Sequence, residues 1–186
     1  MKKLFFAAAL GAAIVSPAYP ADFANVLNDK STVAFTSKQM GVPVDGDFKR
    51  FKAGISFDPA KPQAAQASIE LDVASIDAGS KDANDEVVGK NWFNVKQFPT
   101  ANFKSSAVKP LGGNRFELRG PLTIKGKTHE VVTPVSFRQD GANGVFDGSF
   151  TLKRLDYGLG EGQWADTETV ANEVQIKFHI VAAPKK

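Results

Sequence analysis

Two histidines, His129 and His179, are the residues of this chain best suited to acid–base chemistry near neutral pH, and the chain has no cysteine. The lack of cysteine excludes disulfides, thiolate metal sites and a cysteine nucleophile. His129 follows a turn and borders Glu130, and His179 falls on the strand face that also carries Gln175 and Lys177. We therefore expect both imidazoles to face solvent, and we predict that the protein is not an enzyme and holds no metal or other cofactor.

The segment Gly126-Lys127-Thr128 resembles the end of a phosphate-binding loop, which would indicate nucleotide chemistry. Its spacing does not fit, because five residues separate it from Gly120 where the motif requires four. Val131 and Val132 follow it in a strand-like pattern, so no helix N-terminus is expected there to bind phosphate. The segment is predicted to be a hairpin turn.

Asp82, Asn84 and Glu86 have the spacing of the first ligands of a calcium-binding loop. Val87 stands where that loop requires glycine, so calcium binding is not expected. Acidic residues favour the first turn of a helix, where they interact with its dipole. The pattern predicts one short helix within residues 80–92.

Residues 1–21 have the basic start, the apolar run and the small-residue cleavage region of a secretory signal peptide. Cleavage after Ala18 or after Ala21 fits the pattern, and residues 22–186 are predicted to form one domain in the periplasm. Removal of the two lysines of the signal peptide lowers the formal net charge from +3 to +1. With no clustered basic residues, the domain is not expected to bind nucleic acid, and no later segment is long enough to span a membrane.

Apolar and polar residues alternate along most of the remaining chain, as in strands with one buried face. The alternation predicts strands over residues 32–36, 51–57, 65–73, 115–125, 129–138, 145–152 and 170–182. The turns between them are short and rich in glycine, which favours antiparallel neighbours. These strands could close as a sandwich or a barrel. We predict an all-β fold, a single antiparallel lipocalin-like β-barrel of about eight strands with one short helix.

Several short motifs, spread along the chain, resemble in sequence and order those of the YceI family. The residues that carry the resemblance are Gln39-Met40-Gly41, Asn91–Val95, Phe98–Ser105, Gly120–Thr128 and Arg154–Gly158. The resemblance spans essentially the whole predicted mature chain. It implies a secreted, lipocalin-like barrel whose long apolar pocket holds a polyisoprenoid, a quinone or a fatty amphiphile, with no catalytic motif. Gln39 stands where many members have histidine.

The predicted pocket residues combine strand parity with this resemblance. The chain has 15 phenylalanines, which provide apolar area without a polar group. Trp92 and Phe93 are expected to close one end of the pocket, and residues 155–169, which include Trp164, to form a loop at its mouth. The candidate ligand-binding residues are Phe35, Phe51, Ile55, Phe57, Ile69, Leu71, Trp92, Phe93, Phe103, Leu118, Leu122, Phe146, Phe150, Trp164, Val174, Ile176 and Phe178. The basic candidates for contact with an anionic head group are Lys38, Lys49, Arg50, Lys104 and Arg154.

The expected function is non-catalytic binding, transport or sequestration of an amphiphilic lipid. Two alternatives remain open at the level of sequence. The protein could be an enzyme acting on such a lipid, with a polar cluster inside the barrel. It could also be a barrel with a filled core that acts as a protein-interaction module, because alternating phenylalanines are common in ordinary cores.

Overall fold

The computed structural model describes residues 22–185, and the predicted signal peptide lies outside these residues. None of the helices within this range is long and apolar enough to cross a membrane. Strands make up more than half of the described chain. The strands are β1 (Phe23–Val26), β2 (Thr32–Gln39), β3 (Val42–Phe48), β4 (Phe51–Ser56), β5 (Gln66–Asp72), β6 (Ile76–Asp77), β7 (Thr100–Lys104), β8 (Ala107–Gly112), β9 (Arg115–Ile124), β10 (Lys127–Asp140), β11 (Asn143–Lys153) and β12 (Glu173–Pro184).

The helical elements are few and short. They are α1 (Lys81–Val87) and five single turns of 3₁₀ helix, η1 (Asn28–Lys30), η2 (Pro62–Ala64), η3 (Val73–Ser75), η4 (Arg154–Tyr157) and η5 (Gly162–Trp164). The prediction of one short helix is confirmed in kind, with different bounds. The Ser80 side chain accepts a hydrogen bond from the Ala83 amide and starts α1, which ends at Val87, before Gly89. Trp92 and Phe93 therefore lie in the turns that follow the helix.

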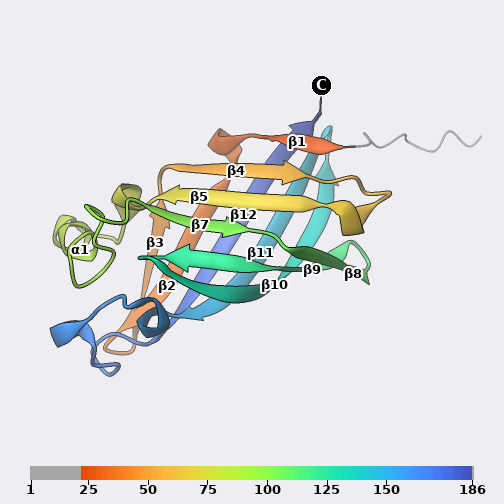
Figure 1. Ribbon diagram of the computed structural model, residues 1–186. Helices are drawn as coiled ribbons and strands as arrows, with labels where there is room; N and C mark the ends of the chain where they lie inside the picture. Colours follow the sequence, from red (N-terminus) through yellow and green to blue (C-terminus); the bar gives the residue numbers. More distant parts are fainter. Residues whose placement is uncertain (1–21, 186) are drawn as a thin grey trace, which may run out of the picture.

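All strands belong to one antiparallel sheet that curls around the interior (Figure 1). The hydrogen-bonded order is β4-β5-β7-β9-β10-β11-β12-β2-β3-β6, with β1 added beside β12 and β8 beside β9. A bridge between Phe23 and Phe57 links β1 to the end of β4. The all-β lipocalin-like architecture is confirmed. The predicted count of about eight strands is wrong, because residues 22–185 form twelve strands in a curled half-barrel.

The strands that the sequence did not predict lack the regular alternation of apolar and polar residues on which the predicted count rests. Residues 41–47 read as a turn because glycine, proline and aspartate interrupt the apolar pattern, yet Val42–Phe48 is β3. Pro43 is tolerated because β6 pairs with β3 only at Asp47 and Phe48, so the rest of β3 is an edge. Strand β8, which includes Pro110, similarly pairs only with β9. Backbone pairing at a sheet edge therefore overrides residue preference at these places.

Candidate functional site

The interior of the half-barrel is hollow. A cavity of about 670 Å³ lies inside the sheet, within the size range of small-molecule sites. Inward-facing apolar side chains such as Phe35, Ile69 and Phe150 remain partly accessible although they point away from bulk solvent. In a filled core these side chains would be fully buried. The described residues therefore do not form the filled core that the protein-interaction alternative assumes.

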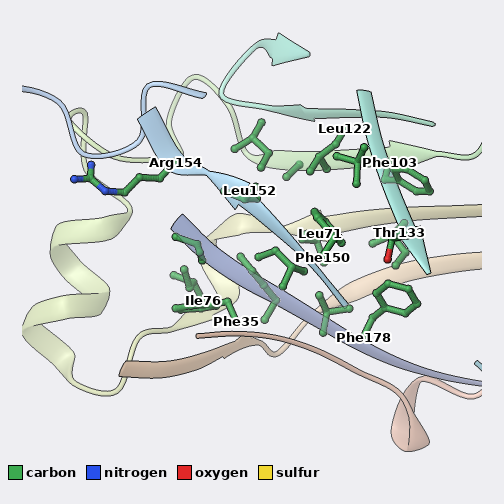
Figure 2. A pocket seen from close by; sticks show the side chains of 18 of the residues that line it. Phe35, Leu71, Ile76, Phe103, Leu122, Thr133, Phe150, Leu152, Arg154 and Phe178 are labelled. Atoms are coloured by element: carbon green, nitrogen blue, oxygen red, sulfur yellow. The ribbon is translucent and has the colours of Figure 1, made fainter. Parts of the chain in front are cut away.

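Sixteen of the seventeen candidate ligand-binding residues lie on the wall of this cavity. The sixteen are Phe35, Ile55, Phe57, Ile69, Leu71, Trp92, Phe93, Phe103, Leu118, Leu122, Phe146, Phe150, Trp164, Val174, Ile176 and Phe178. Phe51, the remaining candidate, packs between hydrophobic clusters at the start of β4 and is not a wall residue. Figure 2 shows how Phe35, Leu71, Phe103, Leu122 and Phe178 approach the cavity from different strands. Contact between these residues and a ligand stays a prediction.

Aromatic rings close one end of the cavity. Phe57 lies 4.8 Å from Phe137, 5.1 Å from Phe146 and 5.4 Å from Phe116, measured between ring centroids. Phe23 extends the cluster at 5.6 Å from Phe137. We call these five residues the aromatic floor. Phe57, Phe116 and Phe146 also touch the cavity, so the predicted pocket residues Phe57 and Phe146 belong to its closed end rather than to its side walls.

The opposite end reaches the surface beside α1. The exposed residues Gln39, Ser80 and Asp82 lie on the wall there. Figure 1 places α1 and the loop after β11 at this same end. We call this end the mouth. It contains polar groups, whereas the rest of the wall is mainly apolar.

Two tryptophans narrow the mouth. The Trp92 and Trp164 rings lie 6.0 Å apart, and the Trp164 indole N–H donates a hydrogen bond of 2.6 Å to Glu86 Oε1 of α1. This bond joins α1 to η5 across 78 residues of sequence. The sequence pattern places Glu86 only in the predicted short helix, and no local signal indicates its pairing with Trp164. The loop of residues 155–169 is thereby attached to the helix.

Arg154 organises the same loop from inside. It is 1% exposed, and burial lowers the pKa of its guanidinium, which stays protonated at neutral pH. All five of its N–H groups donate to backbone carbonyls, and its guanidinium carbon lies 5.5 Å from the centre of the Trp92 ring. The acceptors are the carbonyl oxygens of Leu159 (2.7 Å), Gly160 (3.1 Å), Trp164 (2.7 Å), Val170 (2.7 Å) and Ala171 (3.1 Å).

Gly160 allows the close approach of this loop to Arg154. Its φ is +76°, and a Cβ atom there would lie 2.3 Å from the Arg154 guanidinium nitrogen Nη1. A side chain at this position would therefore displace the guanidinium. The glycines within residues 158–162 indicate a tightly turned loop in the sequence, but they do not indicate the cation that the loop surrounds.

The basic candidates for head-group contact are separated by the fold. Arg154 is the one basic residue on the cavity wall among residues 22–185, and its donors are already used. Lys49 pairs with Asp47 at 2.9 Å and Asp77 at 3.3 Å, and hydrogen bonds to these carboxylates raise its pKa. Of the other three candidates, which also lie off the wall, Arg50 pairs with Asp72 at 2.8 Å, and Lys38 and Lys104 are exposed. The cavity therefore offers no free cationic donor along its described wall.

Both histidines lie outside the cavity wall. The His129 Nε2 atom is 3.2 Å from the carbonyl oxygen of Asp156, and His179 Nδ1 is 2.6 Å from Asp147 Oδ1. His129 is exposed, as expected, whereas His179 is half-buried. Neither imidazole is placed to act on a molecule in the cavity.

Comparisons with known proteins agree with this architecture. A family model described as a YceI-like domain matches residues 25–182. A curated relative, a UPF0312 protein from Azotobacter vinelandii, is 32% identical over 171 residues, which cover 86% of this chain and 88% of the relative. Among solved structures, Burkholderia cenocepacia BcnA is 50% identical with a TM-score of 0.84, and the match covers 86% of this chain and all of that one.

A more distant structure shares the fold alone. It is described as a polyisoprenoid binding domain from Saccharophagus degradans implicated in plant cell wall breakdown. Its sequence identity is 14%, its TM-score is 0.66, and the match covers 90% of this chain and 100% of that chain. The same curled sheet is therefore retained at low sequence identity.

Proposed function

The chain belongs to the YceI-like family, and from that premise we propose that it binds a long apolar amphiphile in its cavity and carries or sequesters it in the periplasm. The observation that carries the proposal is the cavity of about 670 Å³, which has a mainly apolar wall. It lies in the interior of the sheet, where an ordinary domain has a packed core. Each methylene group transferred from water to such a site contributes about 0.8 kcal/mol. The polyisoprenoid binding named for the Saccharophagus degradans domain supports a prenyl chain as the ligand.

The ligand's chain is proposed to lie along the apolar wall, with its head group at the mouth. The aromatic floor at the other end is apolar, so a head group buried there would lose its hydration without gaining a partner, and the chain is expected to enter with its apolar end leading. The mouth has the polar groups that a head group requires, including the carboxylates of Asp82 and Glu86. This arrangement matches the two parts of an amphiphile to the two ends of the cavity.

Charge at the mouth favours an uncharged head group, such as the hydroxyl of a prenol or the carbonyls of a quinone. Asp82 and Glu86 provide negative charge, and the five N–H groups of Arg154 all donate to backbone carbonyls. A diphosphate would meet carboxylates without gaining a free donor, which makes its desolvation costly. A hydroxyl group can donate to a carboxylate oxygen.

The proposed function is binding without covalent chemistry. The wall is predominantly apolar, and its two carboxylates and its arginine lie together at the mouth. Glu86 is already hydrogen-bonded to Trp164, and Arg154 is saturated by backbone carbonyls. Recovery of an added prenol in unchanged form after prolonged incubation supports binding, whereas conversion of the prenol would favour the alternative of a lipid-modifying enzyme.

Intrinsic fluorescence provides the binding test, because both tryptophans of the chain line the cavity. Delipidated protein should show saturable quenching or a spectral shift with geranylgeraniol. Geranylgeranyl diphosphate, which has the same chain, should bind at least about tenfold more weakly, equivalent to about 1.4 kcal/mol. Equal or tighter binding of the diphosphate would contradict the uncharged head group. No response to either compound, confirmed by calorimetry, would contradict lipid binding itself.

A further inference from the structure

Two inward-facing glycines lie opposite phenylalanines on neighbouring strands. Gly46 of β3 pairs with Phe35 of β2, and Gly148 of β11 pairs with Phe178 of β12. A Cβ atom at Gly46 would lie 2.3 Å from Phe35 Cζ and 2.4 Å from the Asp77 carbonyl oxygen of β6, and one at Gly148 would lie 2.2 Å from Phe178 Cζ. Each ring therefore occupies the space above the glycine instead of projecting straight into the cavity. Packing of an aromatic ring over a cross-strand glycine also stabilises the sheet.

The two rings lean in opposite directions along the same wall. The strand order there is β11-β12-β2-β3, so Phe178 leans over β11 and Phe35 over β3. Across the pairing of β12 with β2, Phe178 lies opposite Val33, and Phe35 lies opposite Ile176. Both phenylalanines approach the cavity in Figure 2. Ile176 stays partly accessible on the cavity wall, whereas Val33 is 3% exposed and packs with Phe48 and Ile76.

We propose that Gly46 and Gly148 determine the width of the cavity and make it wide enough for a methyl-branched chain. The inference rests on the proposed function and adds the feature that selects the chain. A prenyl chain carries a methyl branch on every isoprene unit, so it needs a wider channel than a straight alkyl chain. A ring raised from the wall would occupy the volume that these methyl groups require.

The substitution Gly148→Ala tests this inference, because its new methyl group must displace the Phe178 ring into the cavity. The probes are geranylgeraniol and eicosenol, which are neutral alcohols of equal carbon count with branched and straight chains. Affinity for geranylgeraniol should fall about tenfold, since a pocket discriminates a single misplaced methyl group by 10-fold or more. Affinity for eicosenol should fall less than about threefold. Thermal unfolding of the ligand-free variant establishes that it is folded.

Gly144→Ala is the matched control on the same strand. Gly144 also faces inward, but a Cβ atom there would meet Phe137 and Phe23 of the aromatic floor at 3.0 Å, away from the cavity wall. Its ratio of affinities for the two alcohols should equal that of the unchanged protein. A folded Gly148→Ala protein with an unchanged ratio, or a Gly144→Ala protein with an equally shifted ratio, would overturn the inference. Failure of the unchanged protein to bind either alcohol would instead overturn the proposed function.

A second variant keeps the test decisive if Gly148→Ala does not fold, since the new Cβ would also lie 2.8 Å from the Pro134 carbonyl oxygen. Phe178→Ala removes the ring and needs no additional space. Because a flat ring contacts both chains without blocking either, both affinities should fall by the same factor, and their ratio should stay within about twofold. A severalfold rise in the preference for geranylgeraniol would show that the ring already narrowed the cavity, and would overturn the inference.

Discussion

Replacement of Arg154 by methionine is expected to lower the free energy of unfolding by about 3–5 kcal/mol. Methionine retains most of the apolar volume but removes all five hydrogen bonds to the carbonyls of residues 159–171. Loss of the buried charge recovers part of its desolvation cost, yet the carbonyl oxygens lose their hydrogen-bond partners at a buried position. Chemical denaturation should show this loss of free energy, and the midpoint temperature of thermal unfolding should fall by about 10 °C or more.

Lys153→Met is the matched control for this prediction. Lys153 is the preceding residue and is exposed, so its replacement should change the free energy of unfolding by less than about 0.5 kcal/mol. Arg154→Lys should be intermediate, because lysine keeps the charge but has three donors in place of five. A loss below 1 kcal/mol in Arg154→Met would mean that the loop does not depend on this residue.

Replacement of Phe150 by aspartate is expected to weaken prenol binding by more than about a hundredfold, or about 3 kcal/mol. Phe150 lies on the cavity wall in the middle of β11, so the variant places a carboxylate against the proposed chain. Burial of an unpaired charge by an apolar chain costs several kcal/mol. Phe150 is only partly buried on the cavity wall, so a carboxylate there can stay hydrated and the ligand-free protein should remain folded. Tryptophan fluorescence and calorimetry measure the effect.

Thr151→Asp is the matched control, because Thr151 is the next residue of β11 and faces solvent. It introduces the same charge on the other side of the sheet and should bind prenol within about twofold of the unchanged protein. If a folded Phe150→Asp protein bound prenol with similar affinity, the ligand could not lie along this wall.

Strand parity indicates which residues form the cavity wall, because the alternation of side chains along a strand decides which of them point inward. In a strand with one solvent-facing side, alternate side chains must point inward, so Phe150, Val174 and Ile176 could be assigned to the interior from sequence. Parity did not distinguish wall from floor. Phe146 and Phe150 have the same parity on β11, yet Phe146 belongs to the aromatic floor and Phe150 lines the side. That difference depends on where each residue lies along β11 relative to the closed end of the cavity.

The first hairpin shows where local preference misleads. Gly46 and Asp47 read as turn residues, but they belong to β3, and the Phe35 ring of the paired strand fills the space above Gly46. A glycine that accommodates a ring cannot be distinguished in sequence from a glycine that makes a turn. The position of Arg154 inside its loop also cannot be predicted from sequence, because its hydrogen-bond acceptors are backbone carbonyls, which every residue has.

Native mass spectrometry can show directly whether the cavity holds a long apolar amphiphile. The full chain is expressed with its N-terminal segment and purified from the periplasmic fraction without detergent, and bound molecules are extracted with organic solvent and identified. We predict a discrete mass increment that disappears on extraction and corresponds to a neutral prenyl lipid. A single ligand-free mass, together with no uptake of added geranylgeraniol by the same protein, would contradict the account.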